Sequence, residues 1–85
     1  MELKQTVEMM NSADYKERFK AECMQVVIRY KKLANMLGKW DKGELPFTPT
    51  CPRSTYNIQV REMADYIAVL ETRAVMEEVD LEVSE

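Results

Sequence analysis

Two long apolar stripes at helical spacing constrain the fold of this chain more than any other feature. The first runs through residues separated by three or four positions, namely Tyr15, Phe19, Cys23, Val26, Tyr30, Leu33 and Leu37. The same intervals separate the residues of the second, which are Tyr56, Val60, Met63, Ile67, Leu70 and Ala74. Because side chains three and four residues apart lie on one side of an α-helix, each stripe predicts a long amphipathic helix.

The residues that flank the stripes give the expected bounds of the two helices. Ser12 is a favourable N-cap and Gly38 is well placed at the C-terminal end, so we expect the first helix at about 13–37. Thr50 or Cys51 can cap the second helix with Pro52 in its first turn, and we expect that helix at about 52–78. Residues 38–51 then form a connector that contains both glycines.

Two such helices predict an all-α fold, an antiparallel helical hairpin that forms a single domain over residues 1–85. Leu3, Val7 and Met10 have helical spacing and indicate a short helix before the hairpin. At the other end, apolar and acidic residues alternate from Val79 through Leu81 to Val83, which is compatible with a short strand or with a frayed terminus.

A hairpin alone cannot enclose a core, because each helix covers only one side of its partner. Hydrophobic residues make up 46% of the chain, and seven of them are methionines, so much apolar surface would remain in contact with water. We therefore expect the chain to form a homo-oligomeric helical bundle.

Composition excludes several classes of function. The chain has no histidine, which removes the usual general base and the usual zinc ligand, and its two cysteines are expected to be free thiols. We therefore expect no catalytic residues, no metal and no cofactor. A net charge of −3 argues against binding of duplex nucleic acid, and the absence of a long apolar run argues against a membrane span, so we expect a cytoplasmic protein.

Charge is nevertheless distributed unevenly. Between Lys16 and Lys42 there are eight basic and three acidic residues, which favours a local anion site, although a solvated basic helix face gives the same pattern. On the second helix, Gln59, Tyr66 and Arg73 recur every seven residues, so they could converge on a ligand or bridge neighbouring helices.

Several motifs in the sequence resemble a known family. They are DYKERFKAE (14–22), IRYKKLANML (28–37), LPFTPTCP (45–52) and LETRA (70–74). Together they resemble a family of small proteins of tailed bacteriophages that is related to an uncharacterised protein of crAss-like phages. The resemblance implies a helical phage protein in the cytoplasm of an infected bacterial host, without a catalytic motif. By analogy, it is similar in profile to phage proteins that sequester immune signals of the Thoeris or CBASS type.

The leading hypothesis is therefore a non-enzymatic protein that sequesters a nucleotide signal, either a cyclic ADP-ribose derivative or a cyclic oligonucleotide. The alternatives are an adaptor that binds another protein through its methionine-rich helix faces, and a structural accessory of the virion or genome. The candidate ligand-binding residues comprise cations for phosphate, aromatic rings for stacking and hydrogen-bonding groups. They are Arg29, Lys32, Arg53 and Arg73, then Trp40, Phe47, Tyr56 and Tyr66, and finally Thr50 and Gln59.

Overall fold

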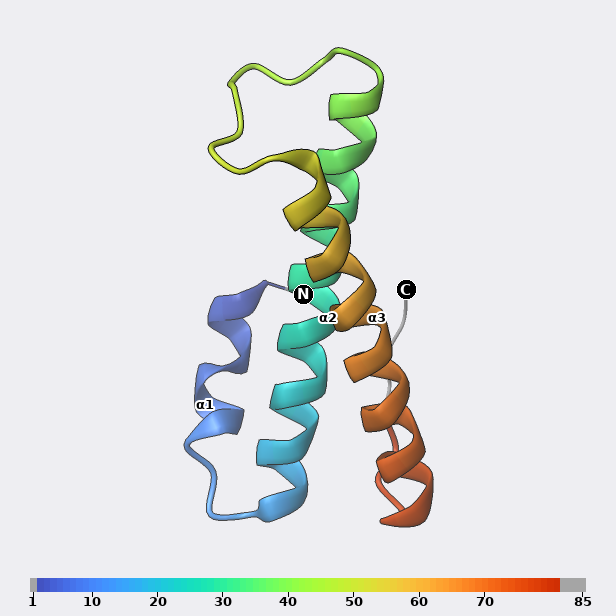
Figure 1. Ribbon diagram of the computed structural model, residues 1–85. Helices are drawn as coiled ribbons and strands as arrows, with labels where there is room; N and C mark the ends of the chain where they lie inside the picture. The colour runs from blue at the N-terminus through green and yellow to red at the C-terminus, as the bar shows by residue number, and fades with distance from the viewer. Residues whose placement is uncertain (1, 82–85) are drawn as a thin grey trace.

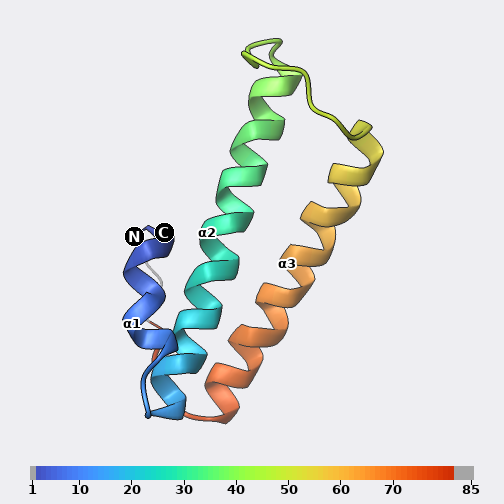
Figure 2. The same cartoon turned by 90° about the vertical axis from the view of Figure 1, so that its left-hand side faces the viewer.

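The computed structural model describes residues 2–81, and its helices lie side by side along one direction. A 3-10 helix η1 (Leu3–Thr6) and a short helix α1 (Val7–Met10) precede two long helices, α2 (Tyr15–Asp41) and α3 (Arg53–Met76). The long helices are antiparallel, and α1 packs on the opposite side of α2 from α3 (Figures 1 and 2). The described residues contain no strand, so the predicted all-α helical hairpin is confirmed.

The start of α2 differs from the prediction by two residues. Asp14, not Ser12, is the N-cap, and its carboxylate accepts a hydrogen bond of 2.9 Å from the backbone N–H of Lys16. Ser12 instead accepts a 3.0 Å hydrogen bond from the N–H of Asp14. A carboxylate at this position also interacts favourably with the positive end of the helix dipole, which explains the choice of Asp14.

The end of α2 lies four residues beyond the predicted one. Gly38 is inside the helix, and the left-handed backbone conformation that favours glycine occurs at Gly43, where φ is +70°. The additional turn brings Trp40 into edge-to-face contact with Tyr56 of α3, with ring centroids 5.9 Å apart. Packing of this aromatic pair offsets the cost of about 1 kcal/mol for a glycine inside a helix.

The start of α3 also differs from the prediction. Pro52 is itself the N-cap, with φ −65° and ψ 154°, and no side chain caps the helix, so capping by Thr50 or Cys51 was a wrong prediction. The carbonyl of Pro52 accepts a 3.0 Å hydrogen bond from the N–H of Thr55, which begins the helical ladder. The fixed φ of proline suits this position, since its missing N–H would have no partner there.

The C-terminal end of α3 is a Schellman motif. The N–H of Val79 donates to the carbonyl of Ala74 at 2.8 Å, and the N–H of Glu78 donates to Val75 at 3.3 Å. This turn ends the helix at Met76 and directs Val79 back into the core, where the side chain is buried. Val79 and Leu81 consequently form no strand, and Val83 lies outside the described residues.

Glu78 occupies the left-handed position of this motif, with φ +57°. A side chain in this conformation costs about 1–2 kcal/mol, whereas glycine adopts it freely. Replacing Glu78 with glycine is therefore expected to raise the free energy of unfolding by roughly 0.5–1 kcal/mol, since glycine also loses more entropy on folding. Urea denaturation would measure this gain. Asp80→Gly is the control, and an equal gain in both variants would contradict this explanation.

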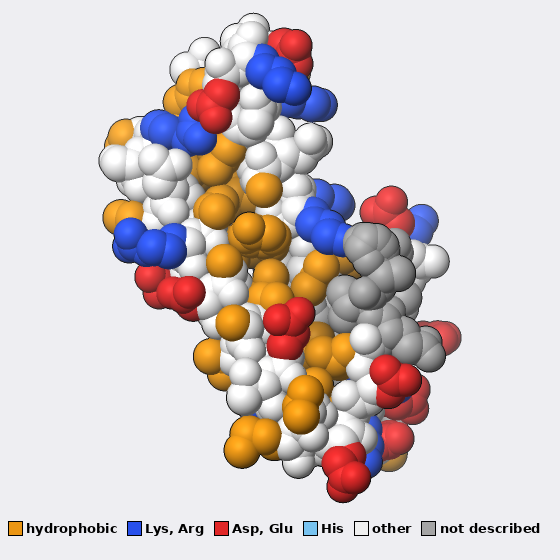
Figure 3. Space-filling model, turned by 90° about the vertical axis from the view of Figure 1, so that its right-hand side faces the viewer, with side chains coloured by type: hydrophobic (Ala, Val, Ile, Leu, Met, Phe, Trp, Pro, Cys, Tyr) orange, Lys and Arg blue, Asp and Glu red, His pale blue; other side chains and the backbone are white. Residues whose placement is uncertain are grey.

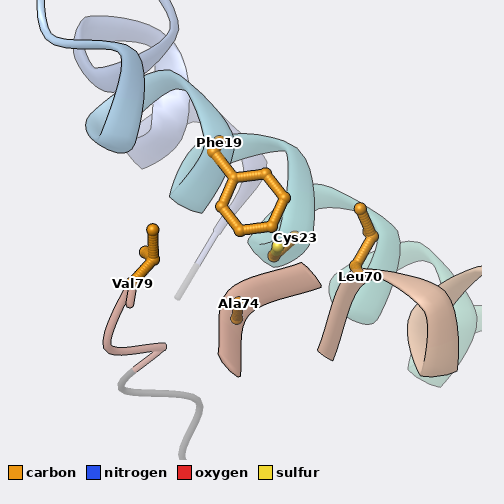
Figure 4. Close-up of a cluster of buried hydrophobic side chains, with 5 residues drawn as sticks. All are labelled: Phe19, Cys23, Leu70, Ala74 and Val79. Carbon is orange, nitrogen blue, oxygen red and sulfur yellow. The ribbon is translucent and has the colours of Figure 1, made fainter. Parts of the chain in front are cut away.

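A small hydrophobic core lies where α2 begins and α3 ends. Its members are Phe19, Cys23, Leu70, Ala74 and Val79, which face one another in Figure 4. Burial raises the pKa of the Cys23 thiol to about 11, so it is protonated at neutral pH, whereas Cys51 lies exposed on the connector. Within residues 2–81, no helix has the length and apolar character that a bilayer span requires.

The N-terminal segment is tied to α2 by a buried hydroxyl. Thr6 has 0% of its surface exposed, and its Oγ1 donates to the carbonyl of Leu3 at 2.7 Å. The same oxygen accepts a 2.9 Å hydrogen bond from Nε2 of Gln25 on α2. The predicted short helix is thus confirmed, and a capping box between Glu2 and Gln5 closes its first turn.

Candidate functional site

A groove of about 570 Å³ runs between α2 and α3. One border of α2 supplies Glu22, Gln25, Val26, Arg29 and Leu33, and α3 supplies Gln59, Met63 and Tyr66. These positions recur at three- and four-residue intervals, so each helix presents one continuous side to the groove. The volume lies within the range of pockets that hold small molecules.

The groove combines a cation, amides and apolar surface. Arg29 is the one basic residue that lines it, and within residues 2–81 its guanidinium has no hydrogen bond or ion pair. Gln59 presents an amide from the opposite helix, while Val26, Leu33 and Met63 supply apolar contacts. An unpaired guanidinium beside amides and apolar side chains can bind a phosphate together with a flat organic group.

Tyr66 bridges the two helices along the groove. Its hydroxyl donates a hydrogen bond to Oε2 of Glu22, and this bond raises the pKa of Tyr66 above its ordinary value of 10.0. One oxygen of the Glu22 carboxylate is therefore engaged by Tyr66, and Arg29 is the one cation that lines the groove. Tyr66 remains 41% exposed as a residue, so its ring can offer a stacking surface.

A second group of residues, the closed-end network, joins the start of α2 to the end of α3. Arg73 donates from Nε to Glu77 at 2.9 Å and from Nη2 to the Tyr15 hydroxyl at 2.7 Å. Tyr15 in turn donates to the other oxygen of Glu77 at 2.5 Å, and the guanidinium carbon of Arg73 lies 4.6 Å from the ring centroid of Phe19. Arg73 thus bridges helices and is not in the groove, whereas Gln59 and Tyr66 line it.

The closed-end network predicts a specific pH dependence. Hydrogen bonds from Tyr15 and Arg73 hold the pKa of Glu77 below its ordinary value of 4.5. A carboxyl whose pKa is lower in the folded state stabilises the fold above its unfolded pKa and loses that contribution as pH falls through its folded pKa. We therefore expect the difference in Tm between wild type and Glu77→Gln to shrink as pH is lowered from 7 to 3. Thermal unfolding followed by circular dichroism measures it, and a constant difference would contradict the role of Glu77.

A third group, the connector cluster, holds the two helices together beside the connector. The guanidinium of Arg53 contacts both carboxylate oxygens of Asp41, at 2.5 and 3.3 Å, and lowers the pKa of that aspartate below its ordinary value. Its Nε donates to Asn57 at 3.0 Å, and its guanidinium carbon lies 5.4 Å from the Trp40 ring centroid. Arg53, Trp40 and Tyr56 are therefore gathered in one place, but the charge of Arg53 is already paired.

The three remaining candidate residues lie outside these groups. Lys32 is on α2, with Nζ 3.9 Å from a carboxylate oxygen of Glu2. Phe47 and Thr50 are both exposed on the connector, and 54% of the surface of Phe47 is accessible. The ten candidates therefore divide between the groove, the closed-end network, the connector cluster and separate positions.

Sequence reasoning did not assign five of the groove residues to a site. Val26, Leu33 and Met63 belong to the apolar stripes, where a core role is the ordinary expectation. Glu22 and Gln25 had no assigned role, although they precede Arg29 by seven and four residues and so share its side of the helix. Glu22 and Gln25 lie at the border of the first apolar stripe, as Gln59 and Tyr66 lie at the border of the second. This shared border position is the signal in the sequence that could have indicated Glu22 and Gln25 as site residues.

Comparison with known proteins identifies a family whose model matches most of the chain. No curated protein sequence and no solved structure matches the chain. The model of one protein family, described as Sequestin, matches residues 13–76, which include α2, the connector and α3 and exclude η1 and α1. Since this match covers most of the 85 residues, the chain belongs to the Sequestin family.

Proposed function

We propose that this protein is a non-enzymatic phage protein that binds and sequesters a nucleotide-derived immune signal in the cytoplasm of the infected bacterium. The observation that carries the proposal is the groove between α2 and α3, in which the unpaired guanidinium of Arg29 faces amide, phenol and apolar groups. The family name supports it, since it denotes sequestration, which is an activity of binding and not of turnover.

In this proposal each groove residue has a definite task. Arg29 pairs with a phosphate, Tyr66 and Met63 contact a base, and the amide of Gln59 forms hydrogen bonds with base or ribose. Arg53 and Arg73 are secondary candidates, because a phosphate would have to displace Asp41 or Glu77 from them. A cyclic ADP-ribose derivative and a cyclic oligonucleotide both present phosphate, ribose and base within a compact volume.

We also propose that the active form is a homo-oligomer. The chain exposes 6054 Å², whereas a compact monomer of its 10.0 kDa mass exposes about 5,200 Å². Part of this surface is apolar, since Ile58 and Val69 on α3 have 51% and 56% of their surface exposed. Figure 3 shows a face along which hydrophobic side chains extend over much of the length of the molecule, with most of the charged side chains beside them. A second copy of the chain would cover such a surface.

Self-association gives a direct expectation for the purified protein. Size-exclusion chromatography with light scattering should give a mass that is a multiple of 10.0 kDa at micromolar concentration, because the exposed apolar surface is then removed from water. A stable species of the single-chain mass over the whole concentration range would contradict the proposal. A monomer that forms a complex only with a host or phage protein would instead support the adaptor.

Isothermal titration calorimetry tests the binding function itself. The purified protein is titrated with ribose-linked cyclic ADP-ribose isomers, cyclic dinucleotides and, as a control, AMP. We expect one of the cyclic compounds to bind with submicromolar affinity at a fixed number of sites per chain, and to be recovered unmodified after heat denaturation of the protein. Release of a cleaved product would show an enzyme, and the absence of heat with every compound would overturn the proposed function.

A further inference from the structure

We propose that Thr6 determines which hydrogen-bonding group of Gln25 is available in the groove, and that the groove therefore selects a ligand group that donates a hydrogen bond. This inference rests on the proposed function, because it assigns specificity to the same groove. Thr6 acts through Gln25 and is a positioning residue. It lies on the N-terminal segment, outside the residues that the family model matches.

The hydroxyl of Thr6 can only accept a hydrogen bond from Gln25. A threonine hydroxyl has one proton, and that of Thr6 is donated to the carbonyl of Leu3 at 2.7 Å. The second neighbour of Oγ1 is the Gln25 amide at 2.9 Å, which must therefore present its N–H and not its carbonyl. Since Thr6 has no exposed surface, water cannot replace either partner.

This contact leaves Gln25 with an acceptor. The amide nitrogen of Gln25 faces Thr6 and the sulfur of Met10, both on the N-terminal segment. The carbonyl oxygen Oε1 makes no hydrogen bond within residues 2–81, and the residue lines the groove. The free hydrogen-bonding capacity of Gln25 is thus that of an acceptor, while Arg29, one turn further along α2, supplies only donors.

The two neighbouring groups therefore distinguish different parts of a nucleotide. A phosphate, which only accepts, fits Arg29 and is disfavoured beside Gln25 Oε1. A base amino group or a ribose hydroxyl can donate and fits Gln25. The N-terminal segment is itself attached to α2 by the hydrogen bond between Thr6 and Gln25 and by its packing along that helix. It thus forms a support for one wall of the groove.

The test compares three probes on three proteins by calorimetry. The probes are ribose-linked cyclic ADP-ribose with adenine, the same compound with unsubstituted purine in place of adenine, which lacks the amino donor, and the same compound without one free ribose hydroxyl. The proteins are wild type, Thr6→Val and Thr6→Ser. We expect wild type to prefer the complete probe over one of the two analogues by about tenfold. Whichever analogue is weakened identifies the donating group.

Thr6→Val removes the acceptor and leaves the Gln25 amide free to rotate, so this preference should fall to about twofold or less. Thr6→Ser retains the hydroxyl, so this variant should show the preference of wild type. If Thr6 acted only through the packing of its methyl group, Thr6→Ser would lose the preference as Thr6→Val does. If Thr6→Val does not fold, Gln25→Met provides the same loss of preference without altering Thr6. Wild-type preference in a folded Thr6→Val or Gln25→Met protein overturns this inference alone, whereas failure of wild type to bind all cyclic probes overturns the proposed function as well.

Discussion

Replacing Leu70 with alanine is expected to lower the free energy of unfolding by about 2–5 kcal/mol. Leu70 is 2% exposed and belongs to the small core with Phe19, Cys23, Ala74 and Val79, so truncation of its side chain leaves a cavity there. A domain of 85 residues has a total stability of roughly 4–13 kcal/mol, so the loss is a large part of it. Urea denaturation followed by circular dichroism measures the change.

Val75→Ala is the matched control for this experiment. Val75 lies five residues further along the same helix and 80% of its surface is exposed, so its truncation should change the free energy of unfolding by less than about 0.5 kcal/mol. Both variants are measured at several protein concentrations, because subunit association adds to apparent stability. Equal losses in the two variants would show that the core is not centred on Leu70.

The largest functional effect is expected for Arg29→Gln. Removing the one unpaired cation of the groove should weaken binding of a cyclic nucleotide probe by roughly 10- to 100-fold, which corresponds to about 1.5–3 kcal/mol for hydrogen bonds to a charged group. The fold should not change, since the guanidinium has no partner within residues 2–81. Calorimetry and thermal unfolding on the same preparation separate binding from stability.

Arg61→Gln is the corresponding control. It removes the same charge from an exposed side chain of α3 that lies 3.7 Å from Glu62 and does not line the groove. The affinity of Arg61→Gln for the cyclic nucleotide probe should remain within a factor of about two of that of wild type. The reason is that Arg61 does not line the groove, and its exposed ion pair with Glu62 contributes little to the stability of the fold. If Arg29→Gln and Arg61→Gln weaken binding equally, the net charge of the protein, and not the groove, attracts the probe.

The arrangement of the helices could be predicted because apolar periodicity over about 20 residues in each helix outweighs local preferences. The helix ends could not be predicted as well, since they depend on contacts across the hairpin. Gly38 has the residue type of a helix end, but the pairing of Trp40 with Tyr56 extends α2 beyond it. In the same way, the Schellman turn after Met76 depends on burial of Val79 in the core. The alternation of apolar and acidic residues after Val79 does not indicate that this valine is buried.

The candidate site was predicted in part for the same reason. Gln59 and Tyr66 share one helix border with Arg73, and helical geometry alone establishes this. Which of them lines the groove depends on contacts with other parts of the chain. Arg73 donates hydrogen bonds to Tyr15, which lies 58 residues away in the sequence, and to Glu77 one turn further along α3. Gln25 could not be linked to Thr6 either, since their contact requires the N-terminal segment to fold back along α2.

The contrast between the two thiols makes the protein convenient for single-molecule and fluorescence work. Cys51 is exposed on the connector, whereas Cys23 is buried and its raised pKa keeps the nucleophilic thiolate scarce at neutral pH. A maleimide dye will therefore attach selectively at Cys51 in the native state. One label per chain, introduced without any substitution, can then count subunits by stepwise photobleaching.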